Sequence, residues 1–341
     1  MNIRSAMKDR SAARKSQLFS AVLAAALLAL PLCAAAPNAE NVAKSIQELL
    51  DAGYVDKAVQ AAQAELAQSP KQPEVHYLLG RAFLSTRQWD RAITELESAT
   101  SITPQSSLFR LWLGRAYGEK ASNVSFLSAV GWAKKTRQAF ERAVELDPNN
   151  LDARSDLTEF YTEAPGFLGG GTDKASAQIE KIAAADPARA HVFRARLAEK
   201  DKKYAEAEQE FRKAISTSAN QPRYWLDLAS YYRRRSQWNE MEKAVQSAVS
   251  SQGRDPEVLL EAAEILHRAK RNLPGAADML RQYLASEEKN ADAPAFRAHF
   301  LLGSILEQQK QPDEALKHYQ ATLAMAKDYQ QARDALNKIK K

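Results

Sequence analysis

Apolar residues recur along this chain at helical spacing, in a pattern that repeats about every thirty-four residues. Pro70 and Pro104 are separated by this interval, and so are Gly80 and Gly114. A repeat of this length encodes one small supersecondary unit that cannot bury its own apolar face, so successive units must stack to make a core. The sequence therefore predicts an array of stacked units.

Within a repeat the pattern consists of two apolar stripes of helical spacing and a following proline, although the first helix of the fifth repeat shows it only weakly. In the second repeat Leu79, Gly80 and Phe83 form the first stripe, and the second stripe runs through Ala92 and Leu96. Small residues are needed where paired helices cross closely, and proline cannot continue a helix. The pattern thus predicts two amphipathic helices and a stop in every repeat.

The details of the helices resemble a known repeat family. Residues 139–148, Ala-Phe-Glu-Arg-Ala-Val-Glu-Leu-Asp-Pro, closely resemble the second helix of a tetratricopeptide repeat, and Trp225, Leu228 and Ala229 resemble its first helix. The resemblance covers roughly residues 39–329. It implies an all-α, superhelical solenoid of about eight helix-turn-helix repeats whose function is to bind other proteins.

The repeats can be placed along the chain to within a few residues. Their predicted bounds are 39–72, 73–106, 107–150, 151–189, 190–221, 222–255, 256–295 and 296–329. Ala92 and Ala143 are expected where the paired helices pack most closely. Residues 330–341 continue a helical pattern and are expected to form the capping helix that the end of a solenoid requires.

The first thirty-five residues do not share the repeat pattern. Basic residues precede an apolar stretch from Leu18 to Leu32, which is too short to span a bilayer permanently, and small residues follow it. This order predicts a secretory signal peptide over residues 1–35, and an exported, periplasmic or secreted chain. A lipid-anchored chain is the alternative, because an aliphatic residue stands three before Cys33, although Leu32 is bulkier than the residue normally found directly before a lipidated cysteine.

Removing the predicted leader changes the charge of the chain. The whole sequence has 48 basic and 42 acidic residues, and residues 1–35 hold five of the former and one of the latter, so 43 and 41 remain. A nearly neutral chain gives no reason to expect nucleic acid as a partner. The single cysteine, Cys33, lies in the leader, so the mature chain is expected to contain no disulfide and no cysteine ligand or nucleophile.

The sequence contains no pattern typical of a catalytic or metal site. The histidines are scattered without a His-Glu-x-x-His pair and are expected to be packing residues: His76, His191, His267, His299 and His318. The glycine-rich run 166–174 lacks the Gly-Lys-Ser/Thr ending of a phosphate loop and is predicted to be a turn. We therefore expect neither an enzyme nor a protein with a cofactor.

Three stretches interrupt the period, at 118–135, 165–174 and 286–294. The first two fall between the paired helices of adjacent repeats, so they occupy equivalent turns and are expected to touch, whereas the third is predicted to be a polar loop. The apolar side chains expected at the contact are Phe126, Trp132, Phe167 and Leu168. They would form either a small core of their own or an exposed edge that binds a partner.

The concave surface is the second candidate site. In tetratricopeptide repeat proteins the first helices line the groove, and the matching positions here are Tyr77, Arg81, Leu111, Arg115, Arg233, Arg234, Glu264 and His267. Aromatic, aliphatic and guanidinium groups suit an extended peptide with some acidic character. The lysine and asparagine clamp with which chaperone-binding members hold a C-terminal carboxylate is absent.

These patterns favour a non-catalytic scaffold or adaptor of the bacterial envelope that binds a protein through the groove, the insertion edge or both. A subunit of an envelope export or assembly machine is the alternative within this class. An enzyme is the alternative of a different class, because Glu119, Glu163 and Asp173 flank the two insertions. Titratable groups converging in a closed pocket would favour the enzyme, and a solvated groove would favour binding.

Overall fold

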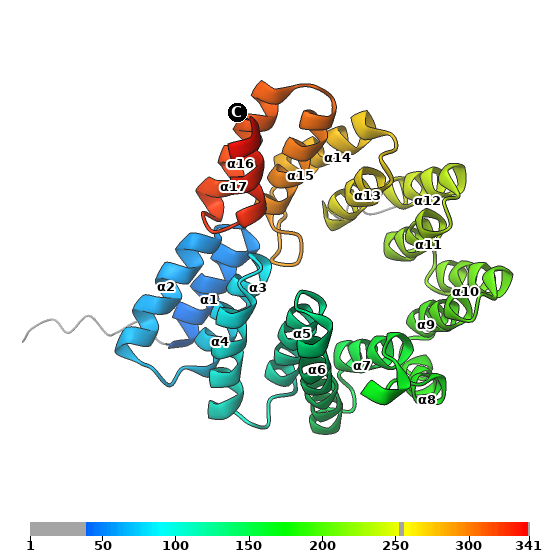
Figure 1. Ribbon diagram of the computed structural model, residues 1–341, viewed down its shortest axis with the longest axis horizontal. Helices are drawn as coiled ribbons and strands as arrows, with labels where there is room; N and C mark the ends of the chain where they lie inside the picture. Colours follow the sequence, from blue (N-terminus) through cyan, green and yellow to red (C-terminus); the bar gives the residue numbers. More distant parts are fainter. Residues whose placement is uncertain (1–38, 252–255, 340–341) are drawn as a thin grey trace, which may run out of the picture. The chain divides into compact units, whose positions relative to one another are not determined.

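Paired α-helices make up the described part of the chain, which in this computed structural model comprises residues 39–251 and 256–339 (Figure 1). These residues form no strand, which confirms the predicted all-α class. The elements are α1 (Ala39–Asp51), α2 (Val55–Gln68), α3 (Pro73–Ser85), α4 (Trp89–Ile102), α5 (Ser107–Ser122), α6 (Phe126–Leu146), α7 (Leu151–Glu163), η1 (Gly166–Leu168), α8 (Thr172–Ala183), α9 (Pro187–Lys200), α10 (Tyr204–Thr217), α11 (Pro222–Arg234), α12 (Trp238–Ser250), α13 (Pro256–Ala269), α14 (Leu273–Ala285), α15 (Ala295–Gln308), α16 (Pro312–Met325) and α17 (Gln330–Ile339). The predicted leader lies outside the described residues.

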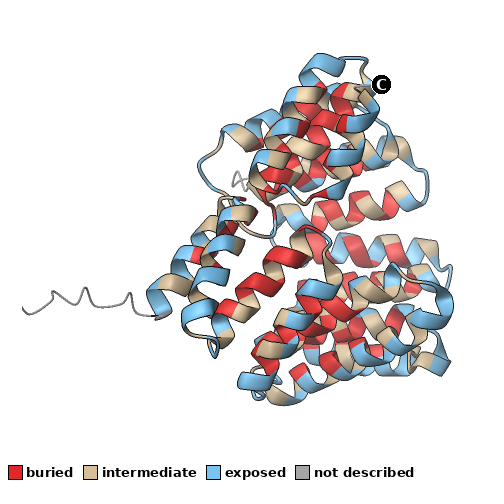
Figure 2. Cartoon of the chain, turned by 60° about the vertical axis from the view of Figure 1, so that its left-hand side comes forward, coloured by how far each residue is buried: buried red, intermediate tan, exposed pale blue. Residues whose placement is uncertain are grey.

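Each odd-numbered helix from α1 to α15 packs against the helix that follows it, and the pairs stack in chain order. Pro70 and Pro104 lie just beyond the ends of α2 and α4, where they stop the second helix of a repeat. Buried residues lie on the faces where helices meet, and exposed residues lie on the outer faces (Figure 2). The core therefore runs from repeat to repeat, as a stacked array requires.

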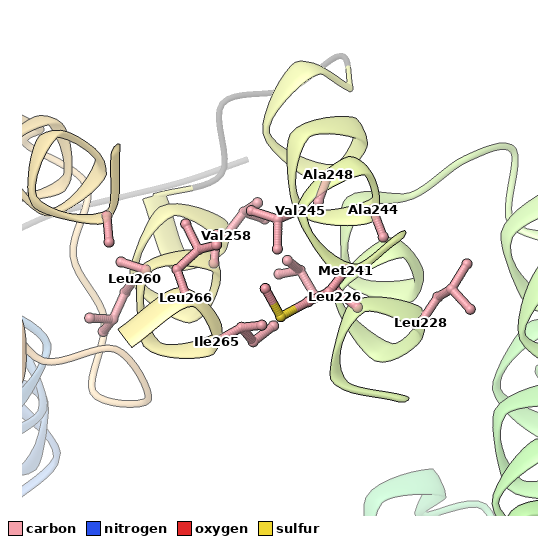
Figure 3. Packing of buried hydrophobic residues seen from close by; sticks show 14 of the residues in the cluster. Leu226, Leu228, Met241, Ala244, Val245, Ala248, Val258, Leu260, Ile265 and Leu266 are labelled. Atoms are coloured by element: carbon pink, nitrogen blue, oxygen red, sulfur yellow. The ribbon is translucent and has the colours of Figure 1, made fainter. Parts of the chain in front are cut away.

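Part of this continuous core is visible in the layer between the sixth and seventh repeats. Leu226 of α11, Met241 and Val245 of α12 and Leu266 of α13 point into one shared layer (Figure 3). All four side chains are buried. Neither repeat alone could remove these side chains from water.

Small residues occupy the helix crossings, as the sequence predicts. A Cβ atom at Gly80 would lie 2.6 Å from Leu96 Cγ, and one at Gly114 would lie 2.5 Å from the ring of Phe140. Ala92 and Ala143 have no exposed surface. The intervals between these small residues are therefore set by the close approach of the two helices in each pair.

We expect Gly114→Ala to lower the free energy of unfolding by about 1–3 kcal/mol, because the new methyl group would overlap the ring of Phe140. Gly118→Ala is the matched control on the same helix. Its Cβ would lie 3.5 Å from Thr136, an ordinary contact, and alanine favours a helix by roughly 0.5–1 kcal/mol over glycine. Urea denaturation measures both variants, and equal stabilities would contradict the assigned crossing.

The residues inserted in the third repeat extend its two helices. α5 has 16 residues and α6 has 21, against 13 and 14 in α3 and α4. The shorter insertion of the fourth repeat forms η1, between α7 and α8, and η1 packs beside α6. The space at Gly169, next to η1, is filled by the guanidinium group of Arg137 from α6. The shorter insertion therefore packs against the helix that carries the longer one, through a residue that follows the stretch 118–135.

The last repeat packs against the first, which the sequence does not predict. All described helices belong to one compact unit, and α16 contacts α2 within it (Figure 1). One hydrophobic cluster joins residues from both ends: Ile46, Val55, Ala58, Phe296, Ala326, Tyr329 and Ala332. The backbone N–H of Lys327 donates to Asp56 at 2.9 Å. α17 thus buries Ala332 in this shared cluster in addition to capping the last repeat.

The loop 286–294 forms the second part of this closure. The backbone N–H of Ala291 donates to the Asp51 carboxylate at 3.0 Å, and Arg81 pairs with Asp292 at 3.3 Å. The hydroxyl group of Tyr283 donates to the carbonyl of Ala293 and so holds the loop against α14. The stretch predicted only as a polar loop therefore bridges the two ends of the array.

Candidate functional site

A cavity of about 590 Å³ lies where the two ends of the array meet. Its walls come mainly from the first helices of four repeats, α3, α5, α13 and α15, with contributions from loop 286–294 and α17. Five arginines contribute to the lining: Arg81, Arg87, Arg115, Arg268 and Arg297. Acidic lining residues are fewer: Glu119, Glu264 and Asp292. The cavity therefore carries an excess of positive groups.

Trp112 stands between two of these arginines on the wall formed by α3 and α5. The guanidinium carbon of Arg81 lies 4.5 Å from the centre of the indole ring, and that of Arg115 lies 4.8 Å from it. Tyr77 packs edge-on against the same ring, with 6.1 Å between ring centroids. Cations over an aromatic face are held in place by the ring quadrupole. This wall thus presents a half-buried aromatic ring with two guanidinium groups against it.

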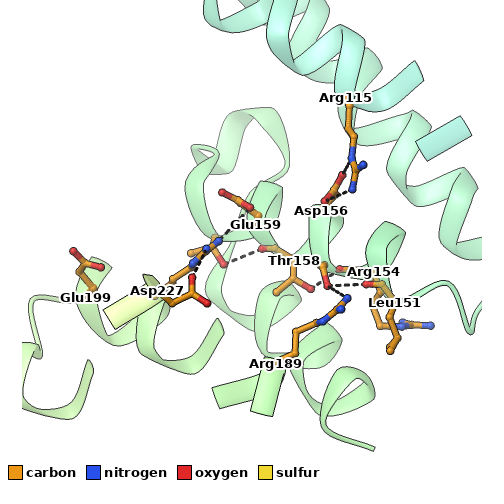
Figure 4. A network of polar contacts seen from close by, with 12 residues as sticks. Arg115, Leu151, Arg154, Asp156, Thr158, Glu159, Arg189, Glu199 and Asp227 are labelled. Carbon is orange, nitrogen blue, oxygen red and sulfur yellow. Dashed lines mark hydrogen bonds and ion pairs between the residues drawn. The ribbon is translucent and has the colours of Figure 1, made fainter. Parts of the chain in front are cut away.

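Carboxylates of neighbouring repeats pair with the arginines of the first helices. Arg115 Nε donates to Asp156 at 2.6 Å, and Arg196 pairs with Glu159 at 3.2 Å and Asp227 at 3.4 Å (Figure 4). Burial raises the pKa of Asp156, although Arg115 beside it acts in the opposite direction. These ion pairs connect the first helix of one repeat to the first helix of the next repeat. They therefore hold the first helices of neighbouring repeats together.

The opposite wall and the loop supply the remaining ion pairs of the cavity. Glu264 accepts from Arg268 at 2.6 Å and from Arg297 at 3.2 Å, so two guanidinium groups share one carboxylate. Arg81 pairs with Asp292, whose side chain is 73% exposed. Arg81 itself is only 12% exposed, so it needs an anionic partner, which can be Asp292 or an acidic group from outside. Asp292 is therefore an anion that an acidic group from outside could replace.

The cavity gathers four of the residues expected in the groove, namely Arg81, Arg115, Glu264 and His267. The prediction for Leu111 was wrong. Its side chain is 2% exposed and belongs to the core cluster that contains Phe140. Its position on α5 faces the second helix of its own repeat, because Gly114 of α5 packs directly on Phe140.

The other predicted groove residues do not line the cavity. Tyr77 packs behind Trp112, against Phe109, with 5.3 Å between the ring centroids of Tyr77 and Phe109. Arg234 makes a two-point ion pair with Glu199, at 2.8 and 2.7 Å. Arg233 is half-buried near Arg234, and burial lowers its pKa. Sequence reasoning missed Trp112, which stands three residues before Arg115 and therefore on the same face of α5.

The apolar residues predicted at the two insertions fall into a half-buried group and an exposed group. Trp132 is half-buried and lies over Tyr117, with ring centroids 5.7 Å apart, so it belongs to a local core. Leu168 is half-buried as well. Phe126 and Phe167 remain 72% and 65% exposed, so these two rings are not part of that core.

Acidic residues near the insertions do not gather with metal-binding partners. Glu119 lines the cavity, whereas Glu163 and Asp173 are exposed at the two sides of the η1 turn. Within residues 39–251 and 256–339 no three His, Cys, Asp or Glu side chains are placed to hold a metal ion. The same residues include no helix long and apolar enough to cross a bilayer.

Three histidines occupy one position of the repeat, each facing the second helix of its own pair. His76 contacts Glu95 at 2.6 Å and His191 contacts Glu210 at 2.7 Å. In the last repeat the partner is a second histidine, with 3.0 Å between the Nδ1 atoms of His299 and His318. Burial, and then the neighbouring His318, lower the pKa of His299 to about 4.

We expect the stability of the protein to fall as the pH drops from about 6.5, the ordinary histidine value, towards about 4. Between these pH values His299 binds a proton in the unfolded chain and stays neutral in the folded chain. Protonation therefore favours unfolding. His318→Glu recreates the pair of the second and fifth repeats and should remove this part of the loss, because a carboxylate favours the protonated ring. Urea midpoints at pH 7 and pH 5 compare the two chains, and an equal fall in both would contradict the prediction.

Comparison with known proteins supports the fold. Sequence models of the tetratricopeptide repeat match residues 49–116, 169–222 and 266–332. No curated protein sequence matches the chain significantly. A tetratricopeptide repeat protein from Parabacteroides merdae is similar in structure at 15% identity and a TM-score of 0.44, over 89% of this chain and 99% of its own. Yeast Tom70 is similar at 16% identity and a TM-score of 0.51, over 84% of this chain and 58% of its own, and this likeness concerns the fold alone.

Proposed function

Since the chain belongs to the tetratricopeptide repeat family, whose members typically serve as scaffolds for protein–protein interaction, we propose that it is a non-catalytic adaptor that binds an acidic segment of a partner protein in the arginine-lined cavity. The observation that carries this proposal is Trp112 held between Arg81 and Arg115 on the cavity wall. Aromatic and arginine side chains in a partly enclosed site are the groups that dominate binding at protein interfaces.

The ion pairs of the cavity favour an acidic partner over a basic one. Arg81 is held by the exposed Asp292, so a carboxylate of the partner can take the place of Asp292 without leaving a buried charge unpaired. Glu264 on the opposite wall is already shared by Arg268 and Arg297 and therefore repels an incoming carboxylate only weakly. The partner's apolar groups would lie on the ring of Trp112.

Affinity capture from an envelope extract tests this function. Wild-type protein and Arg212→Ala should retain the same partner, because Arg212 lies on α10, pairs with Glu208 and does not line the cavity. Arg81→Ala should lose the partner while its circular dichroism spectrum stays unchanged. A partner retained equally by all three proteins would show that binding occurs elsewhere on the surface.

The cellular location is part of the same proposal. The order of basic, apolar and small residues before Ala36 supports export and a periplasmic adaptor, and the alternative is a subunit of an envelope export or assembly machine. Mass spectrometry of the exported protein should find an N-terminus near Ala36 and no lipid. A diacylated Cys33 at the new terminus would instead make the chain a membrane-tethered lipoprotein.

A further inference from the structure

The most exposed large apolar side chains of the described residues all belong to the two insertions. Leu127 is 85% exposed, Phe126 is 72% exposed and Phe167 is 65% exposed, whereas the next value is 43%, at Leu108. Isolated apolar side chains on a surface are ordinary, but these three lie on two adjacent hairpins that contact each other through α6 and η1. Phe126 and Leu127 thus form an exposed apolar tip at the start of α6, and Phe167 is exposed on the neighbouring turn.

The charges around the longer insertion have a single sign. Between Glu119 and Glu141 the chain has no acidic residue and four basic ones: Lys120, Lys134, Lys135 and Arg137. Lys120 pairs with Asp90, whereas Lys134 and Lys135 are exposed. The glycine-rich turn of the shorter insertion, from Ala164 to Thr172, has no charged residue. The stretch of α6 behind its apolar tip is therefore basic and would attract an anionic surface, whereas the acidic Glu163 and Asp173 flank the shorter insertion.

Trp132 and Lys135 lie about one and a half and two and a half helical turns behind Phe126, at the tip of α6. The ammonium nitrogen of Lys135 is 4.6 Å from the centre of the half-buried indole ring of Trp132. Trp132 belongs to the local core beneath this surface, so the lysines supply its polar part. A lysine side chain can lay its aliphatic stem along apolar surface and keep its ammonium group at the level of lipid headgroups.

We propose that this edge docks on an anionic lipid surface, with Phe126 and Leu127 among the acyl chains and with Lys134 and Lys135 at the headgroups. The two side chains project from the start of a helix and line no groove, so a deformable lipid surface suits them better than a rigid protein pocket. The positive charge adds an attraction to anionic headgroups that salt weakens. The residues of this edge do not line the cavity, so this proposal does not rest on the partner proposed for the cavity.

A fluorescent label at the tip tests the proposal without interference from the apolar N-terminal stretch. Cys33 is replaced by serine, and Ser128→Cys, which is exposed next to Leu127, carries an environment-sensitive dye. Vesicles of phosphatidylglycerol and phosphatidylethanolamine should shift the emission to the blue, and phosphatidylcholine vesicles or high salt should reduce the shift. The same dye at Ser216→Cys, exposed on α10, is the control and should not respond.

The variant Phe126→Ser with Leu127→Ser should require at least about tenfold more lipid for the same shift, because each apolar side chain contributes through the area that it removes from water. Since neither residue is buried, the variant should keep the circular dichroism spectrum of the wild type. An unchanged lipid requirement would overturn the proposal. A shift that appears without vesicles as the protein concentration rises would also overturn it, because the edge would then bind a second copy of the chain.

Discussion

Replacing Phe296 with alanine is expected to lower the free energy of unfolding by about 3–5 kcal/mol. The ring has no exposed surface and packs edge-on against Tyr329, with 5.3 Å between ring centroids. The hydrophobic cluster that contains Phe296 also contains Ile46 and Val55 of the first repeat. The substitution therefore removes contacts within the last repeat and at the closure of the array.

The closure of the array predicts which helices should lose protection from hydrogen exchange in Phe296→Ala. Hydrogen exchange should accelerate in α1 and α2 as well as in α15 to α17, because the first repeat loses part of its packing. Phe211→Ala is the matched control, since Phe211 is equally buried but lies in α10, far along the chain from both ends. Its effect should stay in neighbouring repeats. The same loss of protection in α1 for both variants would contradict the closure.

Replacing Trp112 with alanine is expected to weaken binding of the captured partner by about 2 kcal/mol or more, roughly a thirtyfold rise in Kd. The indole ring is the apolar centre of the cavity wall, and Arg81 and Arg115 are positioned against it. Its removal takes away both a contact surface and the support of two guanidinium groups. A titration of the partner against each protein measures the change in Kd.

Trp238→Ala is the control for this experiment. Trp238 is half-buried against the core at the start of α12 and does not line the cavity, so its loss should reduce stability without changing the Kd. Circular dichroism and urea denaturation separate the two effects. Equal losses of affinity in the two tryptophan variants would place the binding site outside the cavity.

The local features of the fold could be predicted because each depends on a short stretch of sequence. Gly80 and Gly114 mark helix crossings since no larger residue fits against Leu96 and Phe140. The closure could not be predicted in this way. Whether the last repeat meets the first depends on the sum of small rotations between all pairs, and no single residue encodes that sum.

In the candidate site, too, some residues could be predicted from the local sequence and others could not. Arg81, Arg115 and Glu264 were predicted because each directly follows the small residue of its first helix, a position that faces the concave side. Leu111 and Trp112 both lie within one turn of Arg115, and helical spacing does not say which of them faces the core. Gly114 packs on α6, and this packing places Leu111 in the core. The role of loop 286–294 was missed because its partners are more than two hundred residues away in the sequence.

Photo-crosslinking inside the cavity tests the central claim most directly. Ser85 lines the cavity on α3, and the photoreactive residue p-benzoylphenylalanine in its place should form a covalent bond to the partner. Thr94, exposed on α4, carries the same group in the control protein. We predict that the Ser85 position captures the partner through a segment rich in aspartate or glutamate and that the Thr94 position does not. Crosslinks that form at Thr94 and not at Ser85 would contradict binding in the cavity.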